Sequence, residues 1–137
     1  MELRLLSWLE AEKAWSLFET RLFRKLAQHS SGWQKMLAGF DLWEWRALAL
    51  CEGDEIRAAL PFGERHTDLG SVAMSSPTPA AYAGVLHIDE TDREEAYRCL
   101  LSAFIEYGRR EKIDVLSLFS SPFREDRELY ERHFAPT

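Results

Sequence analysis

The sequence predicts a single α+β domain in which a mixed, mostly antiparallel sheet carries helices on both faces. Two stretches of helical periodicity precede three consecutive strand-like segments, and a long amphipathic stretch, a last apolar strand and a last helix follow them. A chain of 137 residues is close to the commonest domain size and is long enough to bury a core. The predicted order is β-α-α-β-β-β-α-β-α, for which helices layered on a sheet are the natural packing.

The N-terminal part is predicted to hold one strand and two helices. Residues 2–6 alternate as in a strand, and the Ser-x-x-Glu pattern of Ser7 and Glu10 is typical of a helix start. We expect this helix to run to about Gln28 and a second to cover residues 31–40. The buried face of the first helix is predicted from apolar residues at helical spacing. These are Trp8, Trp15, Phe18, Leu22 and Leu26.

The middle of the chain is predicted to be an antiparallel meander. Glu52–Glu55 is the polar turn of a hairpin, and Gly63–Asp68 is expected to be a second polar connection. Pro61 should limit pairing near the end of the second strand, because proline has no N–H for a ladder. The three predicted strands are Trp45–Cys51, Ile56–Phe62 and Leu69–Met74.

The C-terminal part continues with a helix, a strand and a helix. A second capping box, Thr91 with Glu94, begins a helix that is expected to run to about Lys112. The face of this helix predicted to be buried carries Ala96, Leu100, Ala103, Phe104 and Tyr107. Ile113–Phe119 reads as a strand buried over much of its length and parallel to the third meander strand, through a right-handed crossover. Ser121 followed by Pro122 is typical of the start of a last helix.

Composition and charge exclude several classes of protein. The 17 basic and 23 acidic side chains give a net charge of −6, and the basic residues are scattered, so nucleic acid is not an expected partner. No apolar run approaches the ~20 residues of a membrane span, and no secretory signal is recognisable, so we expect a cytoplasmic protein. Cys51 and Cys99 are expected to be free thiols.

Neither the histidines nor the loop carboxylates predict a metal site, because their spacing matches no metal-ligand pattern. We expect the four histidines on the surface or in loops, and the loop carboxylates in solvent. The histidines are His29, His66, His87 and His133, and the carboxylates are Glu64, Asp68, Asp89 and Glu90.

The segment between the third strand and the long helix is the best candidate for a ligand-contacting loop. Ser75 and Ser76 are expected to bind substrate or cap local backbone, since no Gly-x-Ser-x-Gly elbow marks a nucleophile. Tyr82 either donates a hydrogen bond into a cleft or packs its ring against the sheet edge. No catalytic residue can be assigned from the sequence.

Several short motifs add a family resemblance that spans most of the chain. They are His29-Ser30-Ser31-Gly32-Trp33, Ala59-Leu60-Pro61-Phe62, Ser75-Ser76-Pro77 and Tyr82-Ala83-Gly84-Val85. With the order of elements, they resemble the N-terminal half of FemAB-type proteins, which are aminoacyl or peptidyl transferases built from two GNAT-like units. The resemblance implies that Trp33 and Lys35 face a substrate groove, where the lysine could pair with an anionic group. The alternative is a core tryptophan and a solvated lysine.

Two departures limit what the resemblance implies. A typical acetyl-CoA-binding GNAT protein has an Arg/Gln-x-x-Gly-x-Gly/Ala loop that holds pyrophosphate at a helix N-terminus, and residues 69–95 lack this pattern. No cofactor is therefore expected. The last strands of the GNAT fold are also missing, so residues 1–137 are expected to be one GNAT-like domain that pairs with a second such unit or forms a homodimer.

Three functional hypotheses follow. The first is the domain of a FemAB-type acyl or aminoacyl transferase that binds a small-molecule or peptide-like acceptor substrate and is inactive alone. The second is a non-catalytic interaction domain on the same scaffold, because a fold does not fix a function. The third is a small N-acetyltransferase with a degenerate coenzyme A loop. Whether the chain is an enzyme stays open at this point.

Overall fold

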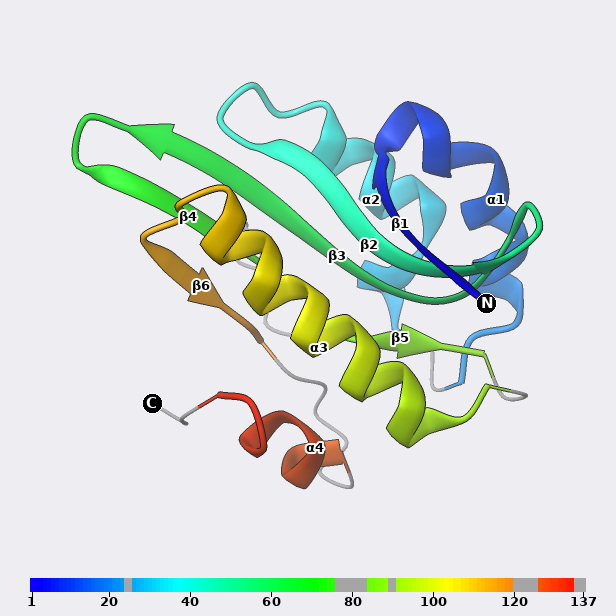
Figure 1. Ribbon diagram of the computed structural model, residues 1–137. Coiled ribbons are helices and arrows are strands. Elements are labelled where there is room, and N and C mark those ends of the chain that lie inside the picture. Colours follow the sequence, from blue (N-terminus) through cyan, green and yellow to red (C-terminus); the bar gives the residue numbers. More distant parts are fainter. Residues whose placement is uncertain (24–25, 76–83, 89–90, 120–125, 135–137) are drawn as a thin grey trace.

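A six-stranded mixed sheet separates two layers of helices (Figure 1). The computed structural model describes residues 1–23, 26–75, 84–88, 91–119 and 126–134. The strands follow the path β1-β2-β3-β4-β6, with β5 beside the other half of β3. Every pair is antiparallel except β4 with β6, which is parallel as predicted. The strands are β1 (Glu2–Ser7), β2 (Glu44–Glu52), β3 (Glu55–Thr67), β4 (Gly70–Met74), β5 (Leu86–His87) and β6 (Val115–Ser117).

The strand β3 is longer than predicted. Residues 63–67, expected to form a polar connection, instead pair with Gly70–Met74. Pro61 does not end β3, because the strand next to it is β2 on one side, whereas neither β4 nor β5 extends to residue 61 on the other side. It faces Ala47 of β2, whereas on the opposite side β4 pairs with residues 63–67 and β5 with residues 58 and 59. In the described part of the chain, Pro61 therefore has no ladder to interrupt on that side.

The first helix is shorter than predicted. The helix α1 (Trp8–Thr20) begins at the expected capping box of Ser7 and Glu10 but ends eight residues before Gln28. The chain turns there because the backbone N–H of Phe23 bonds to the carbonyl of His87, at 3.0 Å. This contact ties the segment after α1 to β5, a strand that the sequence did not predict.

The second helix begins at the predicted residue and ends slightly earlier than predicted. Residues 27–29 form a short 3-10 helix, η1 (Ala27–His29), and α2 (Ser31–Ala38) follows at once. Its N-cap is Ser30, whose Oγ accepts a hydrogen bond from the backbone N–H of Trp33 at 3.2 Å. Serine in this position satisfies an amide that the helix itself leaves free.

Each face of the sheet carries its own hydrophobic core. The helices α1 and α2 cover one core, which includes the fully buried Trp15. The helix α3 (Arg93–Arg110) covers the other and buries the predicted face, with Ala103 half-buried. Its N-cap is Asp92 and not Thr91. The buried members of the predicted face are Ala96, Leu100, Phe104 and Tyr107.

The C-terminal elements lie at the edge of the sheet. The strand β6 is the last strand of the path, so Val115 is 54% exposed and the prediction of a largely buried strand over residues 113–119 is wrong. The last helix, α4 (Arg127–Glu131), buries Leu129 and Tyr130 against α3. The predicted helix start at residues 121–122 lies outside the described residues. Within those residues, no helix combines the length and apolar character needed to cross a bilayer.

Candidate functional site

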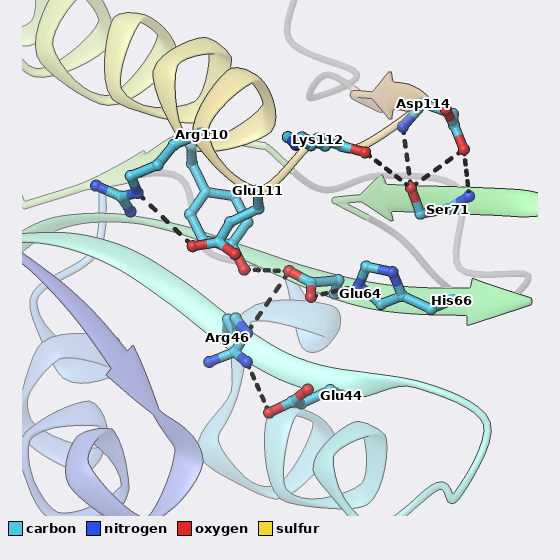
Figure 2. A network of polar contacts seen from close by, with 10 residues as sticks. Glu44, Arg46, Glu64, His66, Ser71, Arg110, Glu111, Lys112 and Asp114 are labelled. Atoms are coloured by element: carbon cyan, nitrogen blue, oxygen red, sulfur yellow. Dashed lines mark hydrogen bonds and ion pairs between the residues drawn. The ribbon is translucent and has the colours of Figure 1, made fainter.

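A buried carboxylate on β3 is the centre of the first polar site. Glu64 is only 7% exposed and faces the C-terminal half of α3, where the phenol of Tyr107 donates a hydrogen bond to its Oε1. The Nε of Arg46 lies 3.6 Å from the same oxygen, and His66 Nε2 lies 2.8 Å from Oε2 (Figure 2). The expectation that Glu64 is a solvated loop residue is wrong. Because β3 continues to Thr67, alternation turns Glu64 inward.

The partners of Glu64 explain why a carboxylate is tolerated there. A buried charge requires a counter-charge and hydrogen bonds, and Arg46 and Tyr107 supply both. Arg46 also pairs with Glu44 at 2.8 Å, which links the network to the start of β2. Burial and the hydrogen bond to Glu64 raise the pKa of Tyr107, so its hydroxyl stays protonated and acts as a donor.

The contact with Glu64 orients the imidazole of His66 so that it can accept a proton. Its side chain is 58% exposed, while one ring nitrogen is held by the buried carboxylate. When Nε2 carries the proton and donates it to Glu64, Nδ1 is left as an acceptor. A carboxylate that orients an imidazole in this way is a common means of preparing a general base.

A second set of contacts, beside this site, anchors the edge strand. The carboxylate of Asp114 accepts a hydrogen bond from the backbone N–H of Ser71 at 2.8 Å, and the Ser71 hydroxyl accepts one from the N–H of Asp114 at 3.0 Å (Figure 2). These reciprocal bonds join the start of β4 to the residue that precedes β6. They hold the parallel pair together next to the Glu64 network.

The second polar site is a pocket of about 510 Å³ at the N-terminus of α3. The carboxylate of Asp92 accepts a hydrogen bond from the backbone N–H of Glu95, at 3.2 Å. The helix N-terminus, which favours anions, therefore receives a carboxylate of its own chain. The ionisable residues that line the pocket, besides Tyr97, are Asp92, Glu94, Glu95, Arg98, Arg132 and His133.

Acidic and basic groups alternate in this pocket. Glu95 pairs with Arg98 at 2.7 Å, and the hydrogen bond to this guanidinium lowers the pKa of the carboxyl. Arg132 and His133 contribute further basic groups from the end of α4. The pocket could thus hold either a cation near the first turn of α3 or an anion near the arginines.

Two buried tyrosines lie near this pocket, and Tyr97 is one of its lining residues. The phenol of Tyr97 donates to the carboxylate of Asp126 at 2.7 Å, and the phenol of Tyr130 accepts from the backbone N–H of Val85 at 2.8 Å. Burial is the main cause that raises the pKa of both phenols. They remain neutral and join α3 and α4 to the segment that leads into β5.

The residues predicted from the sequence to bind substrate lie in different parts of the fold. Trp33 is half-buried and packs against the core under α1 and α2, while Lys35 is exposed and lies 3.7 Å from Glu12. Ser75 is buried, and its Oγ accepts a hydrogen bond from the backbone N–H of Phe119 at 2.8 Å. Ser76 and Tyr82 lie outside the described residues. A substrate-binding role for these five residues stays a prediction.

Two histidines differ from the expectation of surface positions. His29 is buried, its Nδ1 accepts a hydrogen bond from the backbone N–H of Leu26 at 3.1 Å, and burial lowers its pKa to about 4. His87 is buried in β5 and stacks on Phe23, with ring centroids 5.4 Å apart. The two rings contact described residues that follow α1, His29 through Leu26 and His87 through Phe23.

Sequence reasoning missed the Glu64 network because its members lie far apart in the chain. Glu64 and Tyr107 are separated by 43 positions. One signal was present: strand alternation continues from Phe62 through Glu64 to His66, on the face that carries the core of α3. Reading Gly63 as the start of a turn hid this pattern.

Comparisons with known proteins agree on the fold. No protein-family model matches the chain, and no curated protein matches its sequence. Among solved structures, a ribosomal-protein-alanine N-acetyltransferase from Brucella melitensis biovar Abortus 2308 matches with a TM-score of 0.65 at 13% identity, over 100% of this chain and 93% of that one. A probable acetyltransferase matches with a TM-score of 0.68 at 12% identity, over 100% and 92%.

An antibiotic-modifying enzyme gives a similar result. The aminoglycoside 6'-N-acetyltransferase of Acinetobacter haemolyticus matches with a TM-score of 0.60 at 15% identity, over 100% of this chain and 92% of that one. At such low identity, the likeness concerns the backbone arrangement alone. The chain therefore has the fold of the GNAT N-acetyltransferases.

Proposed function

We propose that this chain binds the amine acceptor of an acyl or aminoacyl transfer and takes no acyl-CoA at the N-terminus of α3. In this respect it would act as the N-terminal unit of a FemAB-type protein does. A second GNAT-like unit, either a copy of this chain or a separate domain, would bring the acyl donor. The chain would be inactive alone.

The acidic start of α3 is the observation that carries this proposal. The carboxylate of Asp92 already bonds to a free amide of the helix, and Glu94 and Glu95 follow in the first turn. The diphosphate of an acyl-CoA would meet these three negative charges within a few ångströms. Like charges at such distances repel, even in a partly solvated site.

Charge also supports the acceptor half of the proposal. An amine is cationic until it gives up a proton, and a chain with a net charge of −6 attracts cations over the distance at which molecules meet. The amine must lose a proton before its nitrogen can attack an acyl carbon. His66, held by Glu64 at 2.8 Å, is a group that can accept one.

Calorimetric titration with acetyl-CoA tests the first half of the proposal. We expect no saturable binding tighter than about 10 μM, which corresponds to roughly −7 kcal/mol. The triple variant Asp92→Asn, Glu94→Gln and Glu95→Gln should bind the coenzyme more tightly than the wild type, because the repulsion is removed. The variant Glu106→Gln removes an exposed charge from the same helix, away from this pocket, and should not change binding. Tight binding by the wild type would reject the proposal.

The alternative function is that of a small N-acetyltransferase. One observation favours it: Arg98, Arg132 and His133 line the same pocket and could bind phosphate groups. If this function is correct, the wild type acetylates an amine from acetyl-CoA, and Arg132→Gln raises the KM for the coenzyme. A wild type without turnover and without coenzyme binding would exclude it.

A further inference from the structure

A pocket of about 530 Å³ lies on the opposite face of the sheet from the two polar sites described above. It is formed by the start of α1 and by the segment that joins α2 to β2. Four aromatic side chains and two carboxylates line it, together with smaller residues: Trp8, Phe40, Trp43, Trp45, Asp41 and Glu44. Among the described residues that line the pocket there is no lysine or arginine, and this combination of aromatic rings and acids is the chemistry of a cation site.

Two of the rings meet at a steep angle. Trp8 and Trp45 have centroids 5.1 Å apart and an interplanar angle of 77°, so they form adjoining walls. Behind them Trp15 packs against both, which fixes their positions. Phe40 is 45% exposed and Trp43 is half-buried, so aromatic surface remains open to a ligand. Aromatic faces attract organic cations through the ring quadrupole.

The charges around the pocket favour the same kind of ligand. Within the described part of the chain, Asp41 makes no ion pair, whereas Glu44 forms an ion pair with Arg46. The nearby N-terminus of α1 would repel a cation if it were left bare. Its capping box places the Glu10 carboxylate on the backbone N–H of Ser7 at 3.0 Å, and this charge offsets the helix dipole.

The indole nitrogen of Trp8 differs from those of the two tryptophans packed against it. Trp15 donates its indole N–H to the carbonyl of His29 at 2.9 Å, and Trp45 donates to Gln34 at 2.8 Å. The indole nitrogen of Trp8 is buried, and among the described residues it has no hydrogen-bond partner. A buried N–H without an acceptor is unfavourable. Because Trp8 lines the pocket, its N–H signal can report a change in the packing of the pocket wall when a ligand binds.

We propose that this pocket binds an organic ammonium ligand. The ammonium lies against the aromatic rings beside Asp41. This site goes beyond the proposed transfer function, because it lies on the other face of the sheet and involves neither α3 nor an acyl donor.

Choline and its neutral analogue 3,3-dimethylbutan-1-ol test the proposal, since the two have the same shape and hydroxyl but differ in charge. In nitrogen-15 NMR spectra, choline should shift the indole N–H signal of Trp8 in a saturable way. The neutral analogue should bind at least about tenfold more weakly, because it lacks the cation–π attraction. Equal affinity for the two ligands, or no shift with choline up to about 50 mM, would overturn the proposal.

Three variants locate the site. Trp43→Leu should weaken choline binding about tenfold, and Asp41→Asn should weaken it by a smaller factor. Asp54→Asn removes an exposed acid from the β2–β3 turn and should leave the affinity unchanged. Because Asp41 is exposed, its substitution keeps the test valid if Trp43→Leu does not fold. Unchanged binding in Asp41→Asn and tighter binding in Trp43→Leu would each contradict the assignment.

Discussion

The phenol of Tyr107 on α3 donates a hydrogen bond to the carboxylate of Glu64 on β3, and this bond joins the helix to the sheet where Glu64 pairs with Ala73 near the end of β4. Glu64 also contacts Arg46 and His66, so one buried carboxylate connects two strands and a helix. The position of His66 depends on this carboxylate, and the carboxylate depends on Tyr107.

Removing the donor of this bond should destabilise the fold. In Tyr107→Phe the buried Glu64 loses a partner, and we expect the free energy of unfolding to fall by about 1–3 kcal/mol. Urea denaturation of Tyr107→Phe, Glu64→Gln and the double variant measures the coupling between the two groups. The double variant should lose less than the sum of the single losses. Strict additivity would mean that the bond is absent in solution.

Replacing either of two glycines by alanine should have opposite effects on stability. Gly84 has a φ of +112°, and an added Cβ would collide with the phenol oxygen of Tyr130. Gly84→Ala should therefore lower the free energy of unfolding by at least about 1 kcal/mol. Gly32 lies in α2 with open space around it. Gly32→Ala should therefore be neutral or stabilise the protein by up to about 1 kcal/mol. Thermal or urea unfolding separates the two cases, and equal effects would contradict the geometry around Tyr130.

The buried His29 should make stability depend on pH. Its pKa is lowered to about 4 in the folded protein, whereas an unfolded histidine has a pKa of about 6.5. Between these values the unfolded chain binds more protons, so stability is full above about pH 6.5 and falls as the pH drops toward 4. The loss should reach about 3 kcal/mol. His29→Asn keeps an acceptor for the backbone N–H of Leu26 and should lack this part of the pH dependence. If the plots of unfolding free energy against pH are parallel for the wild type and the variant, the low pKa of His29 is refuted.

The exposed edge of β6 should mediate association. Val115 is 54% exposed and Phe119 is 39% exposed at the last strand of the described sheet. An apolar strand edge is a template for another chain. We predict a homodimer that buries at least about 1,200 Å² through β6 and α4. Sedimentation should show a dimer at micromolar concentration for the wild type and a monomer for Val115→Lys, and a monomeric wild type would contradict the prediction.

The fold was predictable wherever local signals and tertiary packing agree. The capping box of Ser7 and Glu10, the meander and the buried face of α3 are examples, since each follows from a pattern within one segment. The end of α1 was not predictable in this way. A hydrogen bond between Phe23 and His87, distant in sequence, turns the chain where local periodicity favours more helix.

The candidate site was less predictable than the fold. Buried polar groups depend on partners from other elements. Strand alternation is the one local sign of burial for Glu64, and His29 has no local sign of burial. The acidic start of α3 was visible as a run of carboxylates, but its meaning depends on the cap that Asp92 forms with Glu95. The absence of a glycine pattern in residues 69–95 pointed in the same direction.

The backbone N–H of Glu95 gives the most direct test of the central claim, that α3 accepts no acyl-CoA phosphates at its N-terminus. Its NMR signal can be followed while inorganic pyrophosphate or acetyl-CoA is added. We expect this signal not to move in a saturable way, because the Asp92 carboxylate holds the amide at 3.2 Å. A saturable shift with a dissociation constant below about 10 μM, lost in Arg132→Gln, would show that phosphates bind at this helix end and would favour an acetyltransferase.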